Sequence, residues 1–266
     1  MMLPPAITSN TIQNNITTVK MFGLFKKKEQ KREITFDYSS LMVDMHSHIL
    51  PGIDDGAQNP QESIFLIRQM MDVGIKKFIA TPHIMADYYR NTAETINAAL
   101  DVLKAELKKE NIDVEVQAAA EHYFDETFEA RVDEGKLMTM GDNYVLFEFS
   151  FINQPLNTIP VVQKLKDAGY KPILAHPERY PYMDIDQFRS LHDWGVDFQL
   201  NTISLTGYYG AGARKIAEEL IDNQLINFIS SDMHHPRHAE AFKNALKTKY
   251  LEKLLFDYPL KNILLK

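Results

Sequence analysis

The chain has 266 residues, 45% of them hydrophobic, and a formal net charge of -7, which excludes a disordered chain and argues against nucleic-acid binding through a broad basic surface. It contains no cysteine, which excludes disulfides, thiolate metal ligands and a cysteine nucleophile. It has no apolar run of about 18 residues and no secretory signal at its start, so we expect a cytoplasmic protein without a transmembrane segment.

Residues 1–35 are predicted to form a flexible N-terminal tail. Residues 1–20 are rich in Asn, Thr and Pro and lack apolar periodicity, and residues 26–32 are mostly charged. Met21 could be the natural start, with an upstream extension before it, or the whole segment could be a genuine arm. The basic run could meet an acidic membrane face, although a solvated run explains it as well. Residues 36–266 are expected to form one domain.

From about residue 41 onward, short apolar runs alternate with stretches of helical periodicity. The apolar runs predict strands near 41–45, 77–80, 113–120, 144–149, 172–175, 196–200 and 226–230. The stretches between them predict helices near 60–73, 91–110, 125–134, 158–168, 185–194, 213–223 and 237–255. This alternation predicts parallel strands joined by right-handed crossovers, and seven units favour a closed barrel over an open sheet. In either architecture, functional side chains gather at the carboxyl ends of the strands.

The first predicted strand ends in a pair of histidines two residues apart, in Asp44-Met45-His46-Ser47-His48. Residues two apart on an extended chain point the same way, so both imidazoles can reach one metal ion. The pair alone is weak evidence, because two hydrogen-bonded histidines at a strand end would give the same pattern.

Later predicted strands also end in residues that can bind metals. The motifs at these ends are Ala-Thr-Pro-His83, Ala-Glu121-His122, Ala-His176-Pro-Glu-Arg179 and Ser-Ser-Asp232-Met-His234, and Asp54 and Asp55 follow the first strand. Imidazole and carboxylate without sulfur suit Zn, Mn or Fe. Because the alternating architecture brings strand ends to one rim, we expect these residues to form a metal site.

These motifs resemble those of the polymerase and histidinol phosphatase (PHP) superfamily. The segment Asp-Met-His-Ser-His-Ile-Leu-Pro-Gly-Ile-Asp-Asp-Gly-Ala and the segment Ala-His-Pro-Glu-Arg are similar, more narrowly, to bacterial manganese-dependent protein-tyrosine phosphatases encoded with capsule and exopolysaccharide genes. The resemblance covers about residues 41–240. It implies a distorted (β/α)7 TIM-like barrel of the PHP type.

The resemblance also implies a site with up to three divalent metal ions, with manganese expected and Fe, Zn or Mg as alternatives. The implied ligands are His46, His48, Glu121 and Asp232 for the first ion, Glu121 and His176 for the second, and Asp55, His83 and His234 for the third. Asp54 is interpreted as a cap of the turn at Pro51-Gly52. His122 is expected to point away from the site, because it neighbours Glu121 on an extended strand.

Two arginines are predicted to hold phosphate oxygens. Arg179 lies three residues after His176 and can donate a planar fork of hydrogen bonds. Arg237 follows His234 by three residues and is the second candidate, with a helix-surface charge as the alternative. Tyr88 and Tyr89 could stack on a phosphotyrosine ring. The Gly-rich stretch at 207–212 lacks a Walker lysine and is interpreted as a helix start.

The resemblance predicts a phosphatase that hydrolyses phosphotyrosine on a protein, most simply a bacterial tyrosine kinase that controls capsule or exopolysaccharide synthesis. Through that kinase the enzyme would lie close to the inner membrane. One alternative is a small-molecule phosphomonoesterase such as a histidinol phosphatase, and another is a catalytically silent metal-binding module. A nuclease fits the acidic balance poorly, so no nucleic-acid partner is expected. The sequence leaves the oligomeric state open.

Overall fold

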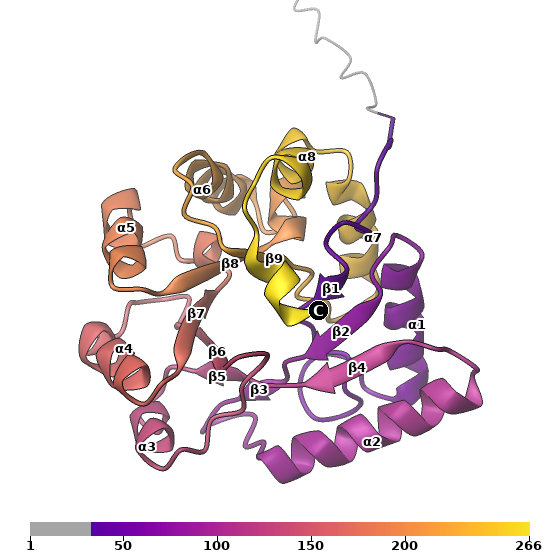
Figure 1. Cartoon of the computed structure of the whole chain (residues 1–266), viewed down its shortest axis with the longest axis horizontal. Helices are drawn as coiled ribbons and strands as arrows, with labels where there is room; N and C mark the ends of the chain where they lie inside the picture. Colours follow the sequence, from indigo (N-terminus) through magenta and orange to yellow (C-terminus); the bar gives the residue numbers. More distant parts are fainter. Residues whose placement is uncertain (1–32) are drawn as a thin grey trace, which may run out of the picture. The chain divides into compact units, whose positions relative to one another are not determined.

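Nine strands and eight α-helices alternate along residues 33–266, the part of the chain that the computed structural model describes (Figure 1). Most of the predicted tail at 1–35 lies outside these residues. The strands are β1 (Val43–Asp44), β2 (Lys77–Ala80), β3 (His83–Ile84), β4 (Glu115–Ala118), β5 (Glu121–Tyr123), β6 (Tyr144–Glu148), β7 (Lys171–Ala175), β8 (Asp197–Asn201) and β9 (Phe228–Ser230). All their pairings are parallel, in the orders β1-β2-β4 and β3-β5-β6-β7-β8-β9.

The helices lie outside the strands in Figure 1, as crossover connections require. They are α1 (Pro60–Met71), α2 (Ala93–Lys109), α3 (Phe128–Asp133), α4 (Thr158–Asp167), α5 (Ile185–Asp193), α6 (Ala211–Asp222), α7 (Pro236–Ala245) and α8 (Lys249–Phe256). The single helix predicted over 237–255 is wrong. It is divided into α7 and α8 because Thr248 caps a new helix, its side chain accepting a hydrogen bond from the backbone N–H of Leu251.

Two of the seven predicted strand segments bend in the middle, which separates the strands into two sheets. The second segment breaks at Thr81-Pro82 between β2 and β3, and the third breaks between β4 and β5. Across these bends, backbone hydrogen bonds join Ala119 N–H to the carbonyl of Ala80 and Glu121 N–H to that of Pro82. The strand predicted at 113–120 is therefore the shorter β4, and β5 is an additional strand that begins just after the predicted one.

The first and last strand segments also meet. Asp232 N–H donates to the carbonyl of His46 and His48 N–H donates to that of Met233, each at 2.9 Å, and Ser47 pairs with Met233 in parallel register. The seven segments therefore follow one another around a distorted ring. The α/β fold of parallel strands predicted from the sequence is confirmed, and the carboxyl ends of β1 and β9 lie side by side.

The strand β6 shows how packing positions the site. All five of its residues are buried, and their side chains alternate between the two faces of the strand. Val145 and Phe147 belong to the core between strands and helices. Tyr144 and Leu146 belong to a second, smaller core cluster together with residues of other strands, such as Met45 and Ile173. The same alternation places Glu148, two residues after Leu146, on the inner face.

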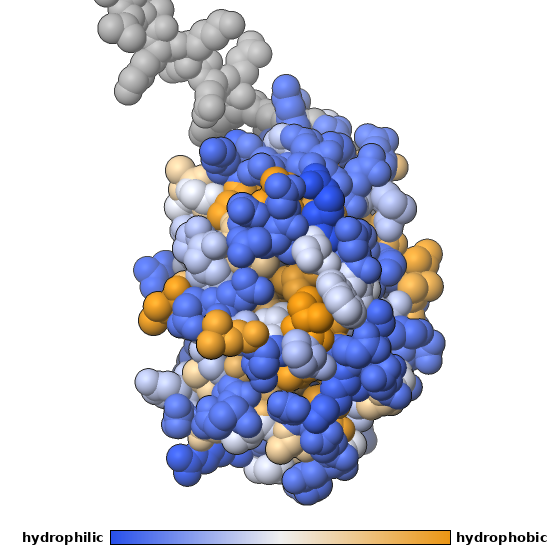
Figure 2. Space-filling view, turned by 90° about the vertical axis from the view of Figure 1, so that its left-hand side faces the viewer, coloured by the Kyte–Doolittle hydropathy of each residue, from blue (hydrophilic) through white to orange (hydrophobic). Residues whose placement is uncertain are grey.

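Polar side chains cover most of the face that Figure 2 shows, with small hydrophobic clusters between them. None of the helices between residues 33 and 266 has the length and apolar character that crossing a bilayer would require.

Candidate active site

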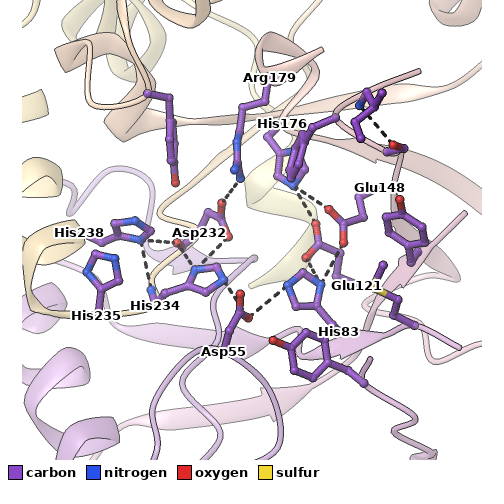
Figure 3. A pocket seen from close by; sticks show the side chains of 17 residues that line it. Asp55, His83, Glu121, Glu148, His176, Arg179, Asp232, His234, His235 and His238 are labelled. Carbon is purple, nitrogen blue, oxygen red and sulfur yellow. Dashed lines mark hydrogen bonds and ion pairs between the residues drawn. The ribbon is translucent and has the colours of Figure 1, made fainter. Parts of the chain in front are cut away.

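A cavity of about 490 Å³ lies at the ends of β3, β5, β6, β7 and β9 and is also lined by residues from the loops after β1 and β8. Ten of its polar lining residues point toward one another in Figure 3: Asp55, His83, Glu121, Glu148, His176, Arg179, Asp232, His234, His235 and His238. His46 and His48 are fully buried and touch Glu121 and Asp232. The structure thus brings together all eight residues that the sequence predicted as metal ligands.

The Nε2 atoms of His46 and His48 face each other. The Nδ1 of His46 lies 2.8 Å from Oε1 of Gln199, and the Nδ1 of His48 lies 2.7 Å from Oδ2 of Asp54. Amide and ionised carboxylate oxygens only accept hydrogen bonds, so each Nδ1 carries a hydrogen, and in the neutral ring each Nε2 presents a lone pair. The two Nε2 atoms are only 3.3 Å apart. Two lone pairs at this distance repel each other unless a positive charge lies between them.

Two carboxylates complete this arrangement. Glu121 Oε2 lies 3.3 and 3.4 Å from the two Nε2 atoms, and Asp232 Oδ1 lies 3.3 and 3.5 Å from them. Ligand atoms bound about 2.0–2.2 Å from one ion in tetrahedral geometry are themselves separated by roughly 3.3 to 3.6 Å. Together with the two Nε2 atoms, Glu121 Oε2 makes a set of three ligand atoms whose separations fit a divalent cation, and Asp232 Oδ1 lies at similar distances from the same two nitrogens.

The pKa shifts of these groups also indicate that a positive charge stabilises the site. Burial alone lowers the pKa of His46, but the carboxylates of Glu121 and Asp232 outweigh burial, so its pKa is raised. Burial alone raises the pKa of Glu121, but His46 and His83 outweigh it, so that pKa is held well below its usual range. The buried site therefore favours carboxylates beside a cation, whether that cation is a proton on imidazole or a metal ion.

A second group of acceptors surrounds His83 and Glu148. His83 Nδ1 lies 3.1 Å from Oε2 of Glu121 and 3.0 Å from Oε1 of Glu148. His176 Nε2 lies 2.9 Å from Oε1 of Glu121 and 3.7 Å from Oε2 of Glu148. Glu121 therefore lies between two groups, in the position that the sequence assigned to a bridging ligand. Glu148 was not predicted, and it adds a carboxylate where the fewest ligands were expected.

A third group lies at the mouth of the cavity. Asp55 Oδ1 lies 3.4 Å from Nε2 of His83 and 3.5 Å from Nε2 of His234. Burial raises the pKa of Asp55, but hydrogen bonds from His234 and His83 lower it by more. The net result is a pKa far below the usual range. His48 is also near enough to share an ion with these three residues. The set matches the predicted third group, and its role as a metal site stays a prediction.

Asp54 does more than the predicted turn cap. Its Oδ1 accepts a hydrogen bond from Gly56 N–H at 3.0 Å, which is the capping contact, while Oδ2 holds the ring of His48. A side chain at Gly56 would place its Cβ 2.0 Å from the carbonyl oxygen of His48, so only glycine fits this turn. The loop therefore fixes His48 through both a side chain and close backbone packing.

His122 points away from the cavity, as predicted. It is fully buried, packs beside Phe128, and its Nε2 lies 3.3 Å from the carbonyl oxygen of Met138. Burial, with a smaller effect of Arg131, lowers the pKa of His122 to about 3. The folded protein therefore keeps this imidazole neutral.

This neutral histidine predicts a pH effect on stability. The unfolded chain, with a histidine pKa of about 6.5, binds a proton that the folded state refuses, so stability falls as pH drops below about 6.5. Between about pH 7 and pH 5, wild type should lose roughly 2 kcal/mol more than His122→Leu. Denaturant unfolding of metal-free protein at both pH values measures the difference. Equal losses in the two proteins would contradict a buried neutral His122.

Arg179 lies between two aromatic rings above the acceptor groups. Its guanidinium carbon is 4.2 Å from the ring centre of Phe151 and 4.3 Å from that of Tyr209, and its Nη1 is 3.4 Å from Oδ2 of Asp232. The preceding Glu178 anchors the turn, because its carboxylate accepts hydrogen bonds from Ser204 Oγ and from the backbone. Arg179 is thus held with its fork directed into the cavity.

Other predicted residues lie at different distances from the cavity. Tyr89 lines it and stacks on His83 with ring centres 5.4 Å apart, whereas Tyr88 is exposed. The structure does not bring Arg237 to the site. It is exposed in the first turn of α7 and does not line the cavity, because that turn carries His238 inward instead.

Comparisons with known proteins identify the family of the chain. The sequence profile of the family "Capsular polysaccharide synthesis, CpsB/CapC" matches residues 42–264. The tyrosine-protein phosphatase YwqE of Bacillus subtilis is 32% identical over 197 residues, which cover 73% of this chain and 78% of that protein. The tyrosine-protein phosphatase CpsB of Streptococcus pneumoniae is 25% identical over 239 residues, covering 84% and 98%.

A solved structure shows the same relationship. It comes from crystallographic work on YwqE of Bacillus subtilis and CpsB of Streptococcus pneumoniae, described there as unique metal-dependent tyrosine phosphatases. It superposes with a TM-score of 0.75 at 30% identity, covering 84% of this chain and 94% of the other. The resemblance that the sequence motifs indicated is confirmed, and the chain belongs to the CpsB/CapC family of capsular polysaccharide synthesis proteins.

Proposed function

We propose that this protein is a metal-dependent phosphatase that hydrolyses phosphotyrosine on proteins. The observation that carries the proposal is the set of facing acceptors at His46, His48, Glu121 and Asp232, with Arg179 above them in an open cavity. Related proteins named tyrosine-protein phosphatases support the same activity.

The residues of the chain divide the chemistry between them. Divalent cations held by the imidazoles and carboxylates would supply Lewis-acid charge that stabilises the phosphoryl oxygens. Arg179 donates hydrogen bonds to the same oxygens, and its aromatic neighbours keep the fork in place. Tyr89 and Tyr123 line the cavity and offer apolar surface to a tyrosine ring. Without a cysteine in the chain, a thiol cannot serve as nucleophile, and we infer that water, activated by the bound cations, would be the attacking group.

The identity of the metal and of the partner are finer parts of the proposal. We infer manganese, since imidazole and carboxylate ligands suit Mn better than Mg. The inferred substrate is a bacterial tyrosine kinase of capsule or exopolysaccharide synthesis, because relatives carry capsule-synthesis names. A cytoplasmic place near the membrane would follow from that kinase and stays a prediction.

The substrate class is tested by comparing two phosphate esters on one preparation. With manganese present, turnover of a phosphotyrosyl peptide should exceed that of histidinol phosphate. A clear preference for histidinol phosphate would favour the small-molecule phosphatase instead. Absence of hydrolysis of either ester, in a protein that binds metal, would favour the catalytically silent module.

Replacing Arg179 by lysine is expected to impair catalysis although the charge is kept. Lysine lacks the planar fork and cannot fill the space between Phe151 and Tyr209 in the same way. We expect kcat/KM for a phosphotyrosyl peptide to fall roughly 100- to 1,000-fold, which corresponds to a lost preorganised donor. Metal content should stay at the wild-type value, because arginine is no ligand.

Arg189→Lys is the matched control for this change. Arg189 lies on α5, is half exposed and pairs with Asp186 and Asn223, away from the cavity. Its replacement should leave kcat/KM unchanged. Normal turnover in Arg179→Lys and Arg179→Ala would mean that Arg179 is an ordinary ion-pair partner of Asp232 and that phosphate is held without it.

A further inference from the structure

A second hollow, here called the side groove, opens beside the cavity. It measures about 560 Å³, and its lining includes Met85, Asp87, Tyr123, Glu126, Ser150 and Leu156. Met85, Tyr123 and Ser150 also line the catalytic cavity. The two hollows therefore share a wall, and a chain that enters one can continue into the other.

Apolar side chains stand exposed around this opening. Leu156 is fully exposed and Ile152 is 86% exposed, and both belong to the loop between β6 and α4. Tyr88, next to Asp87 of the opposite loop, is 75% exposed. Single exposed apolar residues are common, but several around one opening are typical of a binding surface. Ile152 lines the cavity and Leu156 the side groove, so this loop spans both.

The charges of the two hollows differ. Arg179 and the predicted metal groups make the catalytic cavity suited to a phosphate. The side groove instead carries carboxylates at Asp87, Asp125 and Glu126. Asp125 is engaged by Thr127, by the backbone N–H of Ala86 and by an ion pair with Arg131 at 3.4 Å, so it adds little free charge to the groove. Asp87 is exposed and takes part in none of the ion pairs found among residues 33–266.

We propose that the side groove binds the peptide segment next to the phosphotyrosine, and that it selects a segment with an apolar and a basic side chain. The inference rests on the proposed phosphatase function, since the phosphotyrosine itself occupies the catalytic cavity. Leu156 contacts the apolar side chain, and Asp87 and Glu126 attract the basic one. Continuity with the cavity and the opposite charge both favour this occupant over a second copy of the acidic chain.

The test compares three substrates. Two are phosphotyrosyl peptides of equal length, one with Leu and Lys beside the phosphotyrosine and one with Ser and Asp there. The third is p-nitrophenyl phosphate, which is too small to reach the side groove. We expect wild type to prefer the Leu and Lys peptide. Leu156→Ser should raise the KM for the Leu and Lys peptide about 5-fold. The double variant Asp87→Asn, Glu126→Gln should reduce the preference for this peptide over the Ser and Asp peptide roughly 3- to 5-fold.

Matched controls lie on α2, where Val102 and Asp101 are exposed but away from both hollows. Val102→Ser and Asp101→Asn should change nothing, and all variants should hydrolyse p-nitrophenyl phosphate at the wild-type rate. Equal KM for both peptides in wild type and in Leu156→Ser would overturn the side-groove proposal.

Binding of fluorescent versions of both peptides keeps this test separate from catalysis. If the protein hydrolyses none of the three esters yet binds the Leu and Lys peptide more tightly, and loses this preference in Leu156→Ser, the groove proposal stands and the phosphatase proposal fails. Equal binding of both peptides by wild type would contradict the groove whatever the turnover.

Discussion

Prolonged incubation with an excess of chelator is expected to abolish hydrolysis of a phosphotyrosyl peptide. The reason is the convergence of imidazole nitrogens and carboxylate oxygens at His46, His48, Glu121 and Asp232, where divalent cations would supply the charge that stabilises the phosphoryl oxygens. Arg179 would remain as the cation directed into the cavity, and one guanidinium does not replace a metal group.

Added metal should restore this activity in a definite order. Manganese should restore at least as much turnover as magnesium, because magnesium binds imidazole poorly and keeps its waters. Initial rates after removal of chelator, with metal content measured on the same samples, give the comparison. Cysteine-directed reagents are the control and should have no effect, since the chain has no thiol. Full activity in chelator, in protein shown to contain no metal, would contradict the metal mechanism.

Much of the site could be predicted because it follows the periodicity of strands. His46 and His48 are two residues apart after β1, and Glu121, His176 and Asp232 each follow or begin a short buried strand. A parallel α/β arrangement then brings them to one rim whatever the details of packing. The pairing of the segment after β1 with the segment after β9, through Ser47 and Met233, which are 186 positions apart along the chain, needed only that the strands form a ring.

Glu148 was missed although the same rule applied to it. The strand predicted over 144–149 contains Glu148 within an otherwise apolar run, and no role was assigned to this glutamate from the sequence. Because side chains alternate between the faces of a strand, Glu148 lies on the same inner face as Tyr144 and Leu146. There it contacts His83 and His176. A carboxylate at the end of a fully buried strand was the available signal.

The positions of the loop residues could not be predicted, because loops have no regular spacing of side chains. Phe151 and Tyr209 reach Arg179 from two different loops, and their positions depend on how those loops pack against each other. Arg237 does not line the cavity, although the sequence predicted it there, for a related reason. Spacing along the chain suggested a clamp, but α7 begins at Pro236, and the direction of its first turn leaves Arg237 exposed while His238 contacts the carbonyl of Asp232.

Replacing Asp232 by asparagine is expected to lower turnover by more than ~100-fold, since even indirect partners of metal ligands cost 10- to 100-fold. Asp232 lies against both buried imidazoles, and asparagine keeps its size while removing the charge. Asparagine also tolerates the left-handed backbone at this position, where φ is 51°. A loss of activity would therefore reflect the missing carboxylate and not a strained turn.

His48→Ala should give a loss of the same order, and both variants should bind less metal than wild type while their far-UV circular dichroism stays unchanged. His192→Ala is the control, because His192 lies on α5, packs beside Phe198 and does not line the cavity. Measuring kcat/KM and metal per chain for the three variants separates the roles. An equal loss in His192→Ala and His48→Ala would place the site elsewhere, and full metal content in Asp232→Asn would show that this carboxylate positions Arg179 or His234 and binds no cation.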